Sequence, residues 1–471
     1  MSSRRPLLAR TTYIIQSFKE ALQGKEKEYT TGSINRAIFM LSVPMVLEMV
    51  MESLFAVVDV FFVGKLGVNA VATVGLTESV ITLVYSVAIG LSMAATAMVA
   101  RRIGEKKADQ ASHTGIQAIY VGIAFSAVIG LFGAIFAKDI LRLMGADAEL
   151  IAENYMYTRI MMGSNVVIML LFLINGVFRG AGDASIAMRS LWLANGMNII
   201  LCPTLIYGIG PIPALGLTGA ALATTIGRGI GVLYQLYHLF KGNGIIRILP
   251  KHCRIDIPII KNVLKISAGG TAQFLINSAS WIFLVRIVSR FGSDALAGYT
   301  IGIRVIIFTL LPAFGMANAA ATLVGQNLGA NQPDRAEKSV WKAANYNMLF
   351  LGIIAVVFFT FATPIIEIFT HKEQVVNYGV QCLRYISLGY IFYGLGMVLV
   401  QSFNGAGDTK TPTIINIFGF WVFQIPLAYV LSITFDLGPT GVFLAIAIAE
   451  SVIATAAIVL FKKGKWKNTK V

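Results

Sequence analysis

Long apolar runs make up most of the chain, separated by short breaks that contain charged residues, glycine or proline. A helix needs about 20 apolar residues to cross the hydrocarbon core of a bilayer, and most of these runs are long enough. The runs lack the short period-2 alternation of β-barrel strands, and helices satisfy their own backbone hydrogen bonds in lipid. We therefore predict an all-α polytopic membrane protein. The predicted spans are residues 37–63, 71–99, 113–137, 155–178, 188–209, 215–240, 262–288, 296–323, 343–369, 381–402, 412–433 and 440–462, twelve in all.

The chain contains an internal repeat. The hexapeptide FRGAGD at residues 178–183 returns as FNGAGD at residues 403–408, 225 positions later. The same offset places residues 71–104 on residues 296–329 without a gap and with nine identical positions. Near the end of each half, LGLTGAALA matches LGPTGVFLA at an offset of 222. The repeat predicts two homologous halves of six helices each.

An even number of spans returns each half to the side on which it started. The halves are therefore predicted to be parallel repeats about a pseudo-two-fold axis along the membrane normal, an architecture that commonly carries its substrate site between the repeats. A static bundle, such as a channel or a scaffold, is the alternative. The predicted organisation is a cytoplasmic segment at 1–36, a six-helix lobe at 37–240, a cytoplasmic linker at 241–261, a six-helix lobe at 262–462 and a basic cytoplasmic tail at 463–471.

Basic residues are distributed unevenly along the chain, whose net charge is +15. If the N-terminus is placed in the cytoplasm, 28 of the 38 Lys and Arg residues fall on the cytoplasmic side and about six on the opposite side. This asymmetry follows the positive-inside rule. It predicts a multi-pass protein of the cell membrane with both termini cytoplasmic, and it assigns the charge to orientation and not to nucleic acid. An apolar stripe of Ile14, Ile15, Phe18 and Leu22 fits a helix on the inner membrane surface or a tail without fixed structure.

Three acidic residues in the first span are candidates for chemistry. At about 100° per residue, Glu48, Glu52 and Asp59 lie within about 40° of one another on one helix face. Such residues cost about 2.5–3.5 kcal/mol at a membrane helix centre on insertion scales, so the stripe is not expected to face lipid. Burial favours the neutral form of a carboxylate, so proton uptake on one side and release on the other can bias two conformations. The stripe therefore predicts a cation pathway.

A structural role is the alternative for these acids. They can pair with Arg228, Arg286 or Arg304 and hold the two halves together. Glu78 in the second span and Glu450 in the twelfth are further candidates. Arg228 occupies the position equivalent to Glu450 at the offset of 222, which makes a pair between the halves conceivable.

The order and spacing of these features resemble the multidrug and toxic compound extrusion (MATE) family. The resemblance rests on the twelve spans in parallel halves, on the FRGAGD/FNGAGD pair after spans four and ten, and on VVDVFFVGKLG at residues 57–67. It covers about residues 34–462. The resemblance implies a secondary antiporter without an ATP-binding domain, which exports organic, often cationic drugs in exchange for protons or Na⁺. It is nearer to a prokaryotic branch with an Asp site in span one, which makes Asp59 the leading candidate for cation coupling.

The cation site of that branch resembles an Asp in span one, an Asn and an Asp in span five, and a Thr in span six. Asn198 and Thr224 match the Asn and the Thr, whereas Cys202 stands where the span-five Asp is expected. Hard metal cations prefer oxygen ligands, so the loss of a carboxylate favours protons over Na⁺. The cation-coupling residues that we predict are Asp59, Asn198, Thr224, Cys202, Glu52 and Glu48.

Charge is asymmetric between the halves. Another branch of the family carries carboxylates in spans seven and ten, where this chain has Asn277 and Tyr393. Glu48 maps to Gln273 at the offset of 225, so the first half is predicted to be the coupling lobe. The predicted substrate-cavity residues are Glu78, Gln273, Asn277 and Tyr393, with ordinary helix packing as the alternative for the last three.

The predicted function is a secondary active efflux antiporter for amphipathic, mostly cationic organic compounds, coupled to H⁺ in preference to Na⁺. We expect a monomer in membrane lipid, without a cofactor. A flippase for a lipid-linked precursor with a related two-lobe fold is the alternative, although its pyrophosphate group calls for a more cationic cavity. An enzyme is not expected, because the four histidines lie in loops or near span ends without HExxH spacing and no GxxxxGK[ST] phosphate loop occurs.

The repeated hexapeptide itself is predicted to be a turn between the fourth and fifth spans of each half. Its glycines permit tight backbone conformations. Asp183 and Asp408 are expected to cap the helices that follow.

Overall fold

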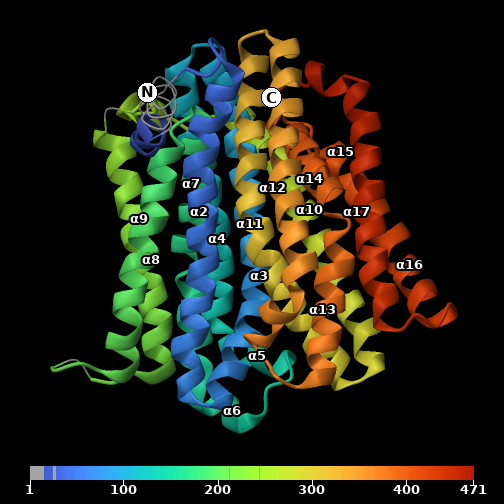
Figure 1. Cartoon of the computed structure of the whole chain (residues 1–471). Coiled ribbons are helices and arrows are strands. Elements are labelled where there is room, and N and C mark those ends of the chain that lie inside the picture. The colour runs from blue at the N-terminus through green and yellow to red at the C-terminus, as the bar shows by residue number, and fades with distance from the viewer. Residues whose placement is uncertain (1–14, 25–27, 212, 243) are drawn as a thin grey trace, which may run out of the picture.

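The computed structural model describes residues 15–24, 28–211, 213–242 and 244–471. For Ala56, Val57, Asp59 and Val60 it describes the backbone only. In the described part of the chain, long helices run side by side in one bundle, and the helical segment at residues 15–23 lies at the same end of it as the C-terminus (Figure 1). We call this the terminal end of the bundle.

Helices of the first half correspond to the first six predicted spans. They are α2 (Ile34–Val63), α3 (Val68–Gly104), α4 (Ala108–Ile135), α6 (Ala148–Gly163) continued by α7 (Asn165–Ala181), α8 (Ala184–Tyr207) and α9 (Gly216–Lys241), with the short α5 (Ala137–Leu143) after α4. We call this set the first lobe. Its helices α8 and α9 lie at one side of the bundle, and the loop region around α5 and α6 lies at the end opposite the termini (Figure 1).

Helices of the second half form the second lobe. They are α10 (Ile257–Val288), α11 (Ser293–Gly329), α12 (Pro333–Glu367), α13 (Glu373–Ser387) with α14 (Tyr390–Gly405), α15 (Lys410–Asn416) continued through η4 (Ile417–Gln424), α16 (Ile425–Tyr429) and η5 (Val430–Thr434), and α17 (Pro439–Lys462). The elements η4 and η5 are π-helical, and α13 and α14 meet at a bend of 57°.

Twelve spans are consistent with these elements. Ten helices in the described residues are long and apolar enough to cross a membrane, and the bent pair α13–α14 makes an eleventh. The twelfth, α9, has 26 residues but contains Arg228, Gln235 and His238, which make it less apolar than the others. It packs along α8, which separates these polar residues from lipid on that side. The chain is therefore a multi-pass membrane protein.

The lobes contact each other through two equivalent helix pairs, α2 with α11 and α10 with α3. Glycines at matching positions of the repeat allow both approaches. A methyl group on Gly315 of α11 would lie 2.7 Å from the Met45 carbonyl oxygen of α2, and one on Gly90 of α3 would lie 2.7 Å from the Thr271 amide nitrogen of α10. Since Gly90 and Gly315 differ by the repeat offset of 225, the sequence identity there reflects a shared steric requirement.

At the terminal end the two lobes are in close contact. Every residue of 94–100 in α3 and of 317–329 in α11 is buried, whereas the opposite halves of both helices contain exposed residues. Gly104 at the end of α3 packs against the Gln326 backbone of α11, and Gly329 of α11 packs against the Arg101 backbone of α3. The lobes are thus closed against each other at this end.

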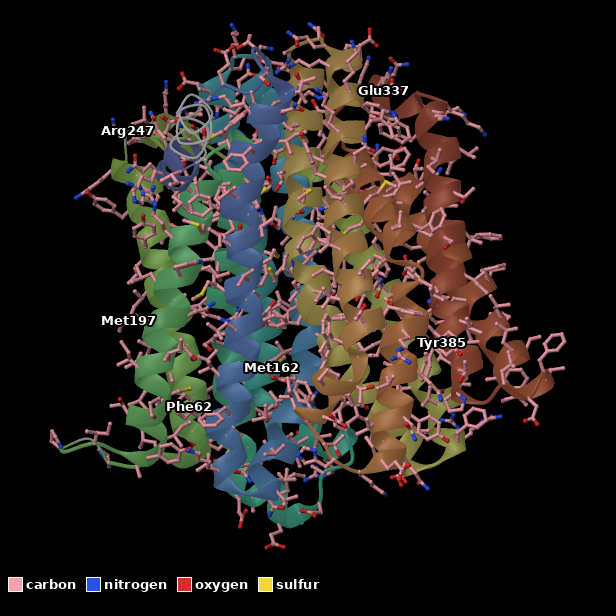
Figure 2. The ribbon with its side chains drawn as sticks, in the orientation of Figure 1. Phe62, Met162, Met197, Arg247, Glu337 and Tyr385 are labelled. Carbon is pink, nitrogen blue, oxygen red and sulfur yellow. The ribbon has the colours of Figure 1, made fainter. Side chains whose placement is uncertain are left out.

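Segments outside the spans also contribute to the closed end. Tyr29 donates a hydrogen bond from its hydroxyl to the Gly182 carbonyl (3.2 Å), and Arg101 donates to the Thr469 carbonyl (2.8 Å). Arg247 and Glu337 also lie toward this end (Figure 2). Residues 15–23 are helical with Ile15 and Phe18 exposed, while Ile14 lies outside the described residues. Contact of this helix with a membrane surface stays a prediction.

The two GAGD turns follow α7 and α14, and their glycines have separate tasks. Gly182 and Gly407 have φ of +86° and +87°, a left-handed conformation that favours glycine. Gly180 and Gly405 instead pack directly against α3 and α11. Asp408 accepts a hydrogen bond from the Thr411 amide (3.1 Å), as predicted for a helix cap.

The capping prediction is wrong for the other aspartate. Asp183 makes no side-chain bond to the backbone of α8, and it accepts a hydrogen bond from the Ser185 hydroxyl instead (3.0 Å). That hydroxyl is a local donor which competes with the backbone for the carboxylate.

Candidate functional site

A cavity of about 450 Å³ lies between the two lobes. From the first lobe it is lined by residues that include Met49, Glu52, Tyr85, Thr96, Phe172 and Arg179. From the second lobe it is lined by residues that include Gln273, Asn277, Phe314, Asn318, Tyr393, Gln401, Asn404, Phe420 and Glu450. A mostly apolar wall with a few polar side chains is the usual composition of a small-molecule site.

A buried ion pair lies beside the cavity in the first lobe. Arg179 of α7 is 3.3 Å from the Glu48 carboxylate of α2, measured from Nη1 to Oε1. Asn175 donates to the same carboxylate oxygen (3.0 Å), and Arg179 also donates to the Ser92 hydroxyl (2.8 Å). Glu48 is only 2% exposed. The charges of both partners are therefore neutralised inside the lobe.

The arginine of this pair is the second residue of FRGAGD. Its equivalent in FNGAGD is Asn404, and the equivalent of Glu48 is Gln273, both at the offset of 225. These two amides also contact each other: Gln273 donates to Asn404 (3.0 Å) and Asn404 donates back to Gln273 (3.0 Å). The same contact between the first and fourth spans is thus ionic in one lobe and a reciprocal amide pair in the other.

Neutral amides continue this contact along the second-lobe wall. Asn404 donates to Gln401 (3.0 Å), and Gln401 donates to Asn318 of α11 (2.6 Å). All three residues are buried, at 2–8% exposure, and all three line the cavity. This side of the cavity offers amide hydrogen-bond donors and acceptors.

A second ion pair joins α2 to α9. Glu52 is 3.3 Å from Arg228, measured from Oε1 to Nη2, and the Arg228 side chain is 2% exposed. The guanidinium also lies 4.6 Å from the centre of the Phe55 ring and 5.7 Å from that of Tyr85. Aromatic faces attract such a cation. Within the described side chains, Arg228 is thus bound by the Glu52 carboxylate and lies near aromatic rings.

Both ion pairs lie within the first lobe. The predicted alternative is confirmed in one part, because a span-one acid, Glu52, pairs with Arg228. The pair does not hold the halves together, since both residues belong to the first lobe, and Arg286 and Arg304 are exposed. The conceivable pair between Arg228 and Glu450 is also not formed in the described part of the chain.

The structure brings two predicted coupling residues into contact. Asn198 of α8 donates a hydrogen bond to the Thr224 hydroxyl of α9 (3.3 Å), and Cys202 lies buried one turn after Asn198. The backbone of Asp59 belongs to α2, but its side chain lies outside the described side chains. The contact between Asn198 and Thr224 is therefore described without the Asp59 side chain.

Three of the four residues predicted to line a cavity do so. Gln273, Asn277 and Tyr393 all belong to the cavity wall. Glu78 does not line this cavity and is exposed. It precedes the lining residue Tyr85 by seven residues and therefore lies about two helical turns away from it along α3. Asn277 also accepts a hydrogen bond from the Trp281 indole (2.8 Å), so it has a packing role as well.

Sequence reasoning missed Arg179, Asn404, Gln401 and Asn318 as cavity residues. One signal was present in the chain: the hexapeptide repeat differs only at its second residue, Arg or Asn, and Glu48 is replaced by Gln at the matching offset. Two coordinated differences of this kind indicate a contact. The role of Gln401 and Asn318 had no such signal.

Comparison with known proteins gives consistent results. A sequence model of the MatE family matches residues 44–204 and 271–430, one segment in each half. The probable multidrug resistance protein NorM of Thermotoga maritima is 27% identical over 446 residues, covering 93% of this chain and 94% of the relative. The probable multidrug resistance protein YoeA of Bacillus subtilis is 26% identical over 404 residues, covering 85% and 87%.

Solved structures share the fold. A multidrug resistance MATE family transporter in an outward-facing conformation superposes with a TM-score of 0.87 at 26% identity, covering 93% of this chain and 97% of that one. A MOP superfamily transporter from Pyrococcus furiosus, for which reversed polarity of the binding pocket suggested a different function, has a TM-score of 0.87 at 26% identity, covering 94% and 98%. These likenesses extend over both lobes.

Proposed function

Because the chain belongs to the MatE family and is therefore a transporter and not an enzyme, we propose that it exports amphipathic organic cations in exchange for protons. The relatives named above are probable multidrug resistance proteins, so small-molecule drugs are the expected class of substrate. The observation that carries the proposal is the cavity between the lobes, because it combines apolar and aromatic walls with buried carboxylates.

The substrate charge follows from the residues around the cavity. Two carboxylates, Glu52 and Glu450, and one guanidinium, Arg179, line it, and Arg179 is neutralised by Glu48. A cavity with this balance attracts a cation more than an anion. Methionines such as Met49 and Met397 are adaptable and suit substrates of varied shape.

Export by alternating access requires two arrangements of the lobes about the cavity. The contact of Gly104 and Gly329 closes the terminal end, and the opposite ends of α3 and α11 are partly exposed. With the positive-inside orientation in the cell membrane, the closed end is cytoplasmic and the structure corresponds to an outward-facing state. A rocking motion that separates the two glycines then opens the cavity to the cytoplasm.

Protons are the coupling ion that the first lobe favours. The Asn198–Thr224 contact provides oxygen atoms, but Cys202 replaces a carboxylate that would favour Na⁺ binding. A proton needs only one titrating group. On the family resemblance we assign this group to Asp59, whereas Glu48 and Glu52 are engaged in ion pairs.

Vesicles that contain the purified protein test the proposal. Efflux of a fluorescent organic cation is measured under an imposed proton gradient, an imposed Na⁺ gradient, and neither. We expect drug movement with the proton gradient, and we expect Asp59→Asn to abolish it while Asp139→Asn, an exposed acid outside the spans, transports normally. Normal proton-coupled efflux by Asp59→Asn contradicts the role of Asp59, and efflux driven only by Na⁺ contradicts proton coupling.

A flippase for a lipid-linked precursor would need a different charge in the same cavity. A pyrophosphate group carries negative charge and needs several uncompensated basic residues. Arg179 is the one basic residue among those that line the described cavity, and it is paired with Glu48. We therefore place the flippase second. Failure of every organic cation to move under either gradient would favour it.

A further inference from the structure

We propose that Glu450 of α17 is the anionic anchor of the cavity, the side chain that binds the positive charge of the exported compound. The inference rests on the proposed export function and deepens it. It separates two tasks of the acidic residues: those of the first lobe serve coupling and structure, and Glu450 selects the substrate.

Glu450 differs from Glu48 and Glu52 in having no ion-pair partner in the described part of the chain. Its side chain lines the cavity but is only 8% exposed. Within the described part of the chain it has neither an ion-pair partner nor a hydrogen-bond partner. A carboxylate in this position has lost most of its water without gaining a compensating contact. It therefore favours a cationic ligand strongly, because the ligand supplies the missing counter-charge.

The remaining charges near the cavity are already compensated. Glu48 pairs with Arg179 and Glu52 pairs with Arg228, each at 3.3 Å. When Glu450 is ionised, its negative charge is thus the uncompensated one among the charged residues that line the described cavity, and a bound cation favours that ionised form. A ligand with one positive charge balances it, and a ligand with one negative charge would meet repulsion.

The residues around Glu450 suit a lipophilic cation. Tyr393 and Met397 of α14, Phe420 of η4 and Ile453 of α17 line the same cavity. Ile453 follows Glu450 by three residues and therefore lies on the same face of the helix. Aromatic rings attract cations, so this wall accommodates a positive charge that is spread over apolar groups better than a strongly hydrated ammonium ion.

The first lobe shows how this fold holds a cation. Arg228 occupies the equivalent position on α9 at the offset of 222, and its guanidinium is bound by the Glu52 carboxylate and lies 4.6 Å from the Phe55 ring centre. The contacts that stabilise this cation thus include the Glu52 carboxylate and the Phe55 ring. In the second lobe the repeat has reversed the charge, so the carboxylate belongs to the protein and the cation must come from the ligand.

Binding of two probe ions of similar shape and opposite charge tests the inference. Tetraphenylphosphonium and tetraphenylborate are titrated onto the full chain in lipid nanodiscs, and empty nanodiscs correct for partition into lipid. The variants are Glu450→Gln, which removes the charge at equal size, and Glu450→Asp, which keeps it. Glu367→Gln is the matched control, because Glu367 is exposed at the end of α12 and outside the cavity.

We expect Glu450→Gln to weaken tetraphenylphosphonium binding by about tenfold or more, since one opposite charge in a poorly hydrated site is worth at least that factor. Tetraphenylborate binding should be unchanged or stronger. Glu450→Asp should bind the phosphonium within a few fold of the parent chain, and Glu367→Gln should bind like the parent. Equal binding of the phosphonium by Glu450→Gln, or an equal loss for both probes, overturns the inference.

Measurements on the parent chain and on Glu450→Gln distinguish a wrong role for Glu450 from a wrong proposed function. If the parent chain binds and exports the phosphonium while Glu450→Gln does so equally well, only the role of Glu450 is wrong. If the parent chain neither binds nor exports it under a proton or a Na⁺ gradient, the proposed export of organic cations is wrong. The Glu450→Gln substitution breaks no ion pair of the described chain, so we expect this variant to fold. Its melting temperature in detergent checks this.

Discussion

Single residues in this protein derive their importance from what they contact in the folded chain. Glu48 and Arg179 are 131 positions apart in sequence and form a buried ion pair, while Gln273 and Asn404 make the same contact without charge. A buried ion pair is costly to break because one charge is left without a partner, yet replacing both partners by matched neutral groups can leave stability nearly unchanged. The second lobe is a natural example of that replacement.

This duplication predicts the outcome of a double-mutant cycle. Glu48→Gln leaves the Arg179 guanidinium without its carboxylate, and Arg179→Asn leaves the carboxylate without its guanidinium, so each should destabilise the protein by about 3–5 kcal/mol. The double variant copies the second lobe and should recover most of the loss. Melting temperatures of the purified proteins in detergent measure the effect. A double variant as unstable as the sum of the single losses would show that the two sites are independent.

Packing of whole helices depends on small residues at the contacts between the lobes. Gly90 lies where α3 meets α10, and Gly315 lies where α11 meets α2. Membrane helices are not driven together by the hydrophobic effect, since lipid is as apolar as their side chains, and close backbone approach through small residues takes its place. The π-helical elements η4 and η5 and the bend between α13 and α14 are further departures from straight helices, and all of them belong to the second lobe.

Alanine substitutions test this packing at the scale of the helix. Gly90→Ala and Gly315→Ala place a methyl group against the backbone of the partner helix, so we expect each to lower stability by about 1–3 kcal/mol, as overpacking does. Gly75→Ala on the same α3 meets nothing within 4 Å and should be neutral or stabilising. Thermal melts of the three variants measure these differences in stability. Equal behaviour of all three would show that close packing of the lobes does not depend on glycine at these two contacts.

The whole molecule is closed at one end through the contact of α3 with α11. Ala100 of α3 packs against Gly325 of α11, and an added Cβ on Gly325 would lie 2.6 Å from the Ala100 Cβ. Residues 94–100 of α3 and 317–329 of α11 are all buried. Any opening of the cavity at the terminal end must separate this pair.

A disulfide across the closed end therefore tests alternating access. Ala100→Cys with Gly325→Cys places two Cβ atoms 2.6 Å apart in the present packing, closer than the roughly 3.8 Å of a disulfide, so the two helices must move slightly apart for the bond to form. Cys253, which is exposed, is replaced by serine in this background. We expect oxidation to stop drug efflux and a reductant to restore it, with either single cysteine variant unaffected by oxidation. Continued efflux with the disulfide formed would contradict an opening at this end.

The sequence by itself determined the number of spans, the repeat and the predicted orientation, because hydrophobic length, self-similarity and loop charge are properties of local segments. It also showed that Glu48 and Glu52 share a helix face, since helical periodicity is local. The tertiary structure alone decided that Arg179 neutralises Glu48, that Glu78 lies outside the cavity, and that Glu450 faces the cavity without a partner among the described residues. Periodicity orients a side chain on its own helix, but the rotation and neighbours of that helix are set by packing against helices more than a hundred residues away.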